Sequence, residues 1–345
     1  MRTLDNINKF LVEKLGQKAQ PTLLDAFNAL SRAYGGEGKA RSKEKALEEL
    51  AIVFVGPAEG VQLKAGPITT SSPKLIELIS FANLRKLDTS AITSMDRMFS
   101  GCSALTSLDV SNFDTKQVTD MGSMFQNCKG FTNLDLSNFD TKAVTDMSEM
   151  FSGCSALTSL DVSNFDTSKV TNMDRMFNYC PALTNLNLSN FDTKAVTSMY
   201  EMFSGCSALT SLDVSNFDTQ KVTSMDRMFY AGIALTSLDV SNFDTKQVTD
   251  MGSMFYGCRA LTSVKFPGEG KWASNANIKT FDISTAPLDV ASIQGLAVAL
   301  ATKTTTATLT LKTSAWEAAK AELMPDGTTV EAYIKAKGWT VSTSN

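Results

Sequence analysis

Two patterns of hydrophobic and polar positions alternate along the chain, and the pair recurs every 26 residues. In "LTSLDVSN", residues 105–112, apolar and polar positions alternate, which is typical of a short β-strand with one buried face. Downstream, apolar residues such as Val118, Met121 and Phe125 follow at steps of three and four, which predicts one face of a short helix. Thr119 is placed to act as the N-cap of that helix.

The repeat decides the expected fold. Seven copies start at Leu105, Phe131, Leu157, Leu183, Leu209, Leu235 and Leu261, and a shortened copy spans Leu84–Cys102. One unit of this size cannot bury enough apolar surface to fold alone, so neighbouring copies must share a core. We therefore predict an α/β solenoid over residues 84–266, with a parallel sheet on one face and short helices on the other.

The stretch "MFQNCKGFTNLDLSNF", residues 124–139, contains the motif F-x-x-C-x-x-[LF]-x-x-L-x-[LV]-x-x-F. This motif resembles the BspA-like leucine-rich repeats, related to the Treponema pallidum type, in a 26-residue form. The likeness covers Leu84 to about Phe266, roughly half of the chain. It implies a curved leucine-rich solenoid of the kind found in bacterial surface proteins, adhesins and phage-encoded proteins. It implies no catalytic residues.

The two ends differ from the repeats. Residues 1–50 carry narrow apolar stripes typical of short helices, so we expect a small helical N-terminal module for docking or oligomerisation, with a simple helical cap as the alternative. Residues 51–83 are expected to form a linker and N-terminal cap. Residues 267–345 are expected to be divergent repeats that form the C-terminal cap. The elements expected there are helices at 289–301, 315–323 and 330–337 and strands at 307–311 and 339–341.

Composition narrows the chemistry. The chain has no histidine, which excludes Ser-His-Asp triads, Cys-His dyads and histidine zinc sites. Its formal net charge of −4 argues against a nucleic-acid partner. The longest strongly apolar run, "AIVFV", is far below the ~20 residues of a membrane span. The first residues show no apolar signal-peptide core, so we expect synthesis in the cytoplasm and, for work outside the cell, another export route or a removed signal.

Six cysteines occupy the same position of successive repeats and therefore form a column. They are Cys102, Cys128, Cys154, Cys180, Cys206 and Cys258. Their even number is compatible with disulfides, but stacked helices lie 8–10 Å apart and a bridge needs Cα atoms within ~7 Å. A zinc site would need C-x-x-C pairs, and the chain has none. We predict a structural column of free, packed thiols, interrupted at Gly232, with no metal and no cofactor.

Two acidic columns accompany the strands. The column in "FDT" is Asp114, Asp140, Asp166, Asp192, Asp218 and Asp244. We interpret it as turn-forming, with calcium binding as the alternative. The second column points out of the predicted sheet and comprises Asp109, Asp135, Asp161, Asn187, Asp213 and Asp239. Because like charges at strand spacing repel, this face must be wet. It is a candidate strip for a basic or sugar partner, or else a plain solvated surface.

Exposed aromatic residues form a second candidate contact patch, because tyrosine and arginine are enriched at binding hot spots. The patch comprises Tyr179, Tyr200, Tyr230, Tyr256, Arg175 and Arg227, all at variable positions of the later repeats. Chance placement is the alternative.

These observations favour a non-enzymatic interaction or adhesion protein. The resemblance and the missing signal peptide together suggest a phage or prophage virion component, such as a tail or head fibre, acting on a protein or glycan of a bacterial cell surface. Residues 1–50 would then contact other virion proteins or form a homo-oligomer. The alternative is a secreted bacterial surface adhesin of the BspA-like family. An enzyme would need a carboxylate pair in the C-terminal cap. We expect no nucleic-acid partner and no membrane span.

Overall fold

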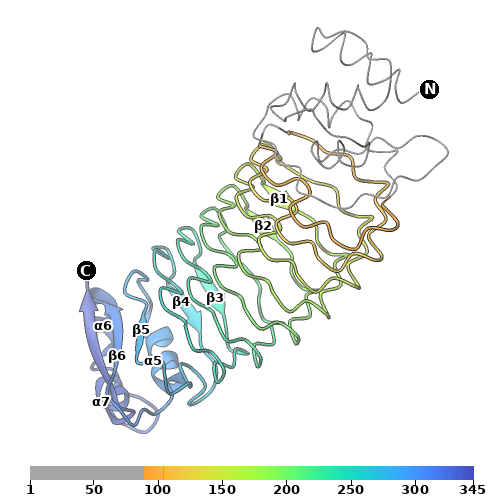
Figure 1. Ribbon diagram of the computed structural model, residues 1–345. Helices are drawn as coiled ribbons and strands as arrows, with labels where there is room; N and C mark the ends of the chain where they lie inside the picture. The colour runs from red at the N-terminus through yellow and green to blue at the C-terminus, as the bar shows by residue number, and fades with distance from the viewer. Residues whose placement is uncertain (1–88, 104) are drawn as a thin grey trace, which may run out of the picture.

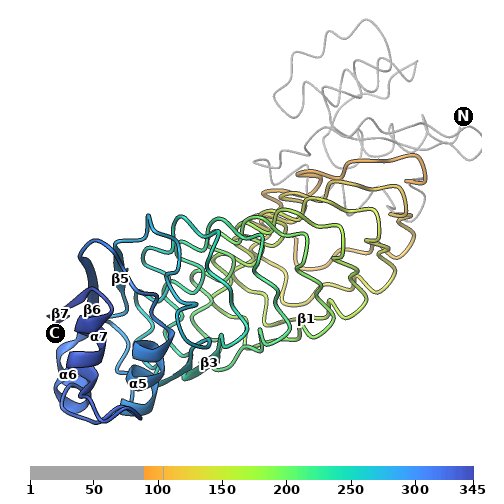
Figure 2. The same ribbon diagram turned by 90° about the horizontal axis from the view of Figure 1, so that it is seen from below.

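The computed structural model describes residues 89–103 and 105–345. The expected module at 1–50, the expected cap at 51–83 and the first residues of the shortened repeat lie outside this range. From residue 89 onward, successive 26-residue turns of the chain, called coils below, stack side by side into an elongated array (Figures 1 and 2). The fold is solenoid-like.

The strand side of the coils is parallel, as predicted. Strand β1 (Ser159–Leu160) pairs with β2 (Asn185–Leu186), and β3 (Ser237–Asp239) pairs with β4 (Ser263–Lys265). In both pairs the partners are 26 residues apart, so every coil places the same residue beside its neighbour. Each strand has only two or three residues, and its central or last leucine or valine is buried while the preceding residue is exposed.

The predicted helices opposite the strands are wrong for the described coils. The segments that contain the Met-x-x-Met-Phe motif consist of consecutive turns. In one coil, the amides of Met147, Glu149 and Phe151 donate to carbonyls of the next coil. The amides between them, such as that of Met150, instead donate three residues back within the coil. Half of the amides are therefore used between coils, where a helix would use them internally.

Left-handed residues explain why the predicted helices do not form. Glu149 has φ 56° and Gly153 has φ 74°, and equivalent positions of the other coils are also positive. A left-handed residue at every fourth position prevents a continuous helix. The turns still direct Met, Phe and Cys side chains inward at steps of three and four, which is the spacing that imitates a helix. Thr119, expected as an N-cap, donates its hydroxyl to the Thr93 carbonyl of the preceding coil.

Two polar columns join neighbouring coils where regular strands are missing. The hydroxyl of Thr167, which is buried, contacts both the amide and the carbonyl of Asp192. The side-chain amide of Asn164 donates to the carbonyls of Leu136 and Phe139, each at 3.0 Å. Both contacts recur at 26-residue intervals. They satisfy backbone groups that would otherwise be buried without partners.

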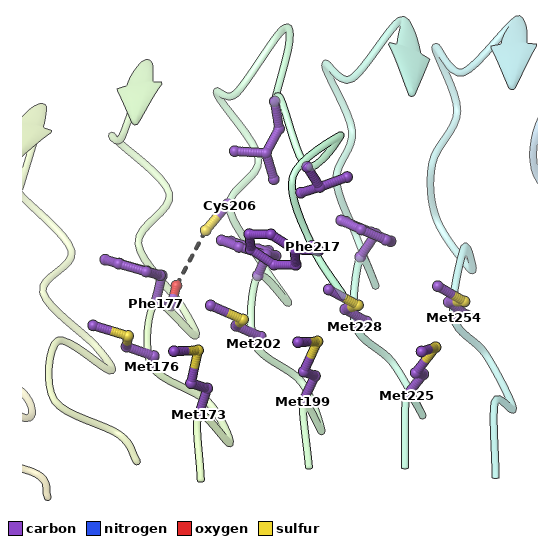
Figure 3. Close-up of a cluster of buried hydrophobic side chains, with 14 of the residues drawn as sticks. Met173, Met176, Phe177, Met199, Met202, Cys206, Phe217, Met225, Met228 and Met254 are labelled. Carbon is purple, nitrogen blue, oxygen red and sulfur yellow. Dashed lines mark hydrogen bonds between the residues drawn. The ribbon is translucent and has the colours of Figure 1, made fainter. Parts of the chain in front are cut away.

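The core is a set of side-chain columns that run along the array. Phenylalanine rings stack from Phe99 to Phe255 with centroids 5.6 to 5.9 Å apart. Figure 3 shows two columns of methionines beside them, including Met173 with Met199 and Met176 with Met202. These residues are almost fully buried, so each coil contributes one layer to a continuous core.

The C-terminal unit has regular elements (Figure 2). They are β5 (Thr280–Asp282), α5 (Val290–Ala299), β6 (Ala307–Lys312), α6 (Thr313–Ala319), α7 (Val330–Ala336) and β7 (Trp339–Ser344). The three expected helices and two expected strands are confirmed, with no end shifted by more than four residues, while β5 was not expected. Strands β5, β6 and β7 form one parallel sheet in that order. Asp289 caps α5 by accepting the amide of Ser292.

Candidate contact surface

The outward acidic column forms local turns. Asp161 is exposed, and its carboxylate accepts the amide of Ser163 at 2.9 Å. The Ser163 hydroxyl and amide together hold the pKa of Asp161 below its ordinary value. Asn187 accepts the amide of Ser189 in the same way, which explains why an asparagine can replace an aspartate here. The rest of the column is exposed except Asp239, which is half-buried and ion-paired with Lys265. Its use as a binding strip stays a prediction.

The "FDT" column is also tied to the backbone. The Asp166 carboxylate accepts the amide of Ser168 at 3.0 Å, and the other members do the same with the residue two positions on. The predicted turn role is therefore confirmed. Within residues 89–103 and 105–345, no cluster of three or more cysteine, aspartate or glutamate side chains is arranged to hold a metal ion.

The arginines of the predicted patch are engaged in contacts between coils. Arg175 Nε lies 2.7 Å from Glu201 Oε2, and its Nη1 lies 3.7 Å from Glu149 Oε1. Arg227 pairs with Glu201 at 3.5 Å and donates to the Tyr200 hydroxyl at 3.1 Å. The Arg175 guanidinium also lies 4.7 Å from the centroid of the Tyr200 ring. Burial alone would raise the pKa of Glu201, but the hydrogen bond from Arg175 and the nearby charges lower it overall. These groups stabilise one another and are poorly placed to bind a charged partner.

The other three tyrosines line one edge of the array, which we call the tyrosine edge: Tyr179, Tyr230 and Tyr256. Tyr179 is 66% exposed and Tyr256 is 49% exposed. The rings of Tyr230 and Tyr256 stack at 5.4 Å. The backbone register places them in order, because the Gly205 amide donates to the Tyr230 carbonyl and a Cβ on Gly205 would touch the Tyr179 ring at 3.5 Å. The structure therefore divides the predicted patch into a charged interior part, with Tyr200, and an aromatic edge.

Ile233 is a further exposed apolar residue, and it was not predicted. It is 50% exposed and follows Tyr230 by three residues. The aligned repeats carry a signal for it, because the same position is Ser155, Pro181, Ser207 or Arg259 in other coils. Isoleucine is therefore an exposed apolar residue at a position that other coils fill mainly with polar or charged residues.

Tyr179 has an unusual backbone. Its φ is 54°, in the left-handed region, and the same position in four other coils is Gly101, Gly153, Gly205 and Gly257, all with positive φ. Glycine adopts this conformation without a steric penalty, whereas a residue with a Cβ is destabilised by roughly 1–2 kcal/mol. Among the described residues, the most exposed large aromatic side chain therefore stands at a position where glycine fits better.

The cysteines are free and buried. Each of five thiols donates to the carbonyl of a phenylalanine 29 residues earlier, as Cys206 does to Phe177 at 3.1 Å (Figure 3). Burial raises the pKa of Cys180 and of Cys258 to about 12, so these thiols are protonated at neutral pH. The 8–10 Å separation of stacked helices does not keep these thiols apart, because the described coils contain no helices there.

The break in the column leaves a small void. At Gly232 an apolar cavity of about 10 Å³ is lined by side chains that include Phe203, Cys206 and Leu235. It is at the lower limit of the space that holds one water molecule, and it has no polar lining to retain one. It is therefore a packing defect and not a ligand site.

Membrane insertion through a helix has no candidate in the part of the chain that the structure describes. Its helices are too short and too weakly apolar to span a bilayer.

Comparisons with known proteins give a family. The family model described as "Mycoplasma protein of unknown function, DUF285" matches residues 74–177 and 155–265, which together span more than half of the chain. No curated protein matches. A solved structure, the functional domain of InlJ from Listeria monocytogenes, described as including a cysteine ladder, is 17% identical with a TM-score of 0.20. That match covers 60% of this chain and 53% of the other, about half its length, and a score this low carries no argument.

Proposed function

The chain belongs to the DUF285 family, and from this premise we propose that it is a non-enzymatic interaction protein whose coils present the tyrosine edge to a partner. A family of tandem repeats indicates a surface or protein-interaction role, because stacked coils provide an extended face and no single pocket. The observation that carries the proposal is Tyr179, an exposed aromatic residue in a left-handed conformation.

Strain at an exposed residue supports a role in binding. A left-handed residue with a Cβ lowers the stability of the fold, and residues in sparsely populated backbone conformations cluster at functional sites. The Tyr179 ring is 66% exposed, so it contributes little to the core in return. Glycine in the sister coils shows that the fold itself does not require a tyrosine at this position.

The chemistry of the edge favours a partner with a neutral, partly apolar surface. Tyrosine combines an apolar ring with a hydroxyl that can form hydrogen bonds, which suits the face of a sugar or an apolar protein patch. The nearest arginines, Arg175 and Arg227, are ion-paired with Glu201. The partner is therefore a glycan or a protein on a cell surface, bound without a strong charge requirement. The outward column from Asp109 to Asp239 is the second candidate, supported by its exposure alone.

A bacterial surface protein of the BspA-like leucine-rich type is our first proposal for the setting. It is supported by the repeat motif and by the family description, which names Mycoplasma, a genus of bacteria. A tail or head fibre of a phage is the second proposal, and it rests on the resemblance of the repeats alone. In both settings the partner lies outside the cell that made the protein.

The proposal is tested with the full chain on a printed panel of cell-surface glycans and purified extracellular proteins. We expect saturable binding to at least one member of the panel, with the bound ligand recovered chemically unchanged. The variant with Tyr179, Tyr230 and Tyr256 all changed to Ser should lose that binding while its thermal unfolding stays cooperative. Retained binding by this variant, or conversion of the bound ligand to a product, would contradict the proposal.

A further inference from the structure

We propose that the building unit of the array is a pair of coils, 52 residues long, and that alternating side chains fix the order in which coils stack. The 26-residue repeat describes the backbone, but within residues 107–227 three columns of side chains alternate with twice that period over at least four successive coils each.

The first alternating column is in the core. Val110, Leu136, Val162, Leu188 and Val214 occupy equivalent positions, and each is about 1% exposed. A larger and a smaller side chain therefore follow each other along the array. Close-packed interiors respond to a change of a single methylene group, so two leucines side by side would overfill this column. Leucine neighbours do not occur in it, whereas the valine pair of Val214 and Val240 does.

The second alternating column carries charge. Glu149, Arg175, Glu201 and Arg227 occupy equivalent positions of four successive coils. Each arginine is ion-paired with a glutamate of an adjacent coil, at 2.7 to 3.7 Å. The Glu201 side chain is only 16% exposed, so water screens it less than a fully exposed charge. If one coil were removed, two residues of like charge would become neighbours.

The charged residues of the second column share one backbone conformation. Glu149, Arg175, Glu201 and Arg227 have φ between 53° and 56°, in the left-handed region. Glycine would be less strained there, and it occupies the left-handed position four residues later in several coils. Arg97, Ser123 and Ser253 have positive φ at the same position, so this conformation belongs to every described coil and the second column rests on its ion pairs.

The sequence records the same period. The segment "SGCSALTSLDVSNFDT" occurs unchanged at residues 100–115, 152–167 and 204–219, at 52-residue intervals. The intervening coils differ from it in the same way, with "TNLDLSNFDT" at 132–141 and "TNLNLSNFDT" at 184–193. From Ser107 to Ser211 the exposed residue at the start of the strand alternates accordingly between serine and asparagine, which is the third column.

Two deletions in the full chain separate a one-coil unit from a two-coil unit. Deleting residues 153–178 removes one coil and places Glu149 beside Glu201 and Leu136 beside Leu188. Deleting residues 153–204 removes two coils and places Glu149 beside Arg227 and Leu136 beside Val214. In a solenoid of equivalent coils, the longer variant would be the more stable one. We expect the opposite, with the one-coil deletion unfolding at a urea midpoint lower by about 0.5 M or failing to fold.

A rescue experiment keeps the test decisive if the one-coil deletion is unstable for another reason. Glu149→Arg with Leu136→Val removes the neighbouring glutamates and the neighbouring leucines from that deletion, so its urea midpoint should rise to or above that of the two-coil deletion. The same two substitutions in the full chain place two arginines side by side and should lower its midpoint. A one-coil deletion at least as stable as the two-coil deletion, or substitutions that shift both backgrounds in the same direction, would overturn the proposal.

Discussion

The hydroxyl of Thr167 binds both backbone groups of Asp192 in the next coil. It donates to the Asp192 carbonyl at 2.9 Å and accepts from the Asp192 amide at 2.8 Å. The side chain thus replaces two hydrogen bonds that a regular β-ladder would have supplied. The contact recurs from Thr89 to Thr219, so one side-chain hydroxyl per coil holds the array together at the turn that follows each strand.

Thr167→Val should destabilise the fold by about 2–4 kcal/mol, because it leaves a buried amide and a buried carbonyl without partners. Thr158→Val is the matched control, since the Thr158 hydroxyl is exposed and makes only one bond, to the Thr132 carbonyl. Its effect should be about 0.5 kcal/mol or less. Urea unfolding followed by circular dichroism measures both. Similar losses for the two variants would contradict the role given to Thr167.

Gly232→Ala should stabilise the fold by up to about 1 kcal/mol, because the methyl group enters the void and the unfolded chain loses freedom. Part of this gain is offset, since the Cβ would lie 3.2 Å from the Phe229 carbonyl oxygen, which must shift slightly. Gly232 is not left-handed, and its amide donates to the Phe229 carbonyl at 3.1 Å, as that of Cys206 does to Phe203. A side chain therefore fits the same backbone one coil earlier.

Gly257→Ala provides the contrast to this substitution. Gly257 has φ 83°, and a Cβ there would lie 3.1 Å from the Cα of Ala231. We expect a loss of roughly 1–2 kcal/mol in the free energy of unfolding. A gain at position 257 or a loss at position 232, measured by thermal unfolding, would show that the coils are not packed as described.

Tyr179→Gly should raise stability by about 0.5–1 kcal/mol, since it relieves a left-handed residue whose ring is mostly exposed. Ala231→Gly is the matched control, because Ala231 has φ 55° at the equivalent position and presents no aromatic ring. Both variants should gain stability, but only Tyr179→Gly should weaken partner binding. If Tyr179→Gly were destabilising, the tyrosine would be a packing residue and the argument from strain would fail.

Alkaline pH should destabilise the protein through its buried thiols. Cys180 and Cys258 have folded pKa values of about 12, above their ordinary value of 9.0, so the folded state holds these protons more tightly. The contribution of these thiols to the free energy of unfolding is fully present below pH 9 and is lost as the pH rises toward 12. Each thiol should change the free energy of unfolding by about 1.4 kcal/mol per pH unit in that window.

Cys180→Ala isolates this effect. Between pH 9 and 11 its unfolding free energy should fall less steeply than that of the unchanged protein, by the slope of one thiol. Urea titrations at several pH values measure the difference. Equal slopes would mean that Cys180 ionises freely in the folded state.

The sequence was sufficient to predict the stacking, the parallel strands and most elements of the C-terminal unit. The 26-residue period and the alternation around Leu160 and Leu186 lead directly to these features. The helices of the coils were mispredicted because inward residues of tandem turns have the same spacing as those of a helix. Tandem turns and a helix differ in the hydrogen-bond acceptors of their backbone amides. In the coils, amides such as that of Glu149 donate to carbonyls of the next coil. Because these acceptors are supplied by a neighbouring coil, the local sequence carries no signal for them.

The contact surface was predicted in part. Tyr179 and Tyr256 are exposed as expected, whereas Arg175 and Arg227 are paired with Glu201. The pairing could have been inferred by aligning the repeats, because residues at equivalent positions become neighbours in a solenoid. The left-handed conformation of Tyr179 has no signal in its own local sequence, and only the glycines at the equivalent position of other coils point to it.

The most direct test of the account compares two surfaces for the same ligand, the strongest binder found on the panel. One variant changes Tyr179, Tyr230 and Tyr256 to Ser, and the other changes Asp109, Asp135, Asp161 and Asp213 to Asn, which keeps the turns that Asn187 already shows to be compatible. Dissociation constants are measured by surface plasmon resonance. We predict binding weaker by tenfold or more for the tyrosine variant, about 1.4 kcal/mol, and within twofold of the unchanged protein for the aspartate variant. Unchanged binding by the tyrosine variant together with loss in the aspartate variant would contradict the account.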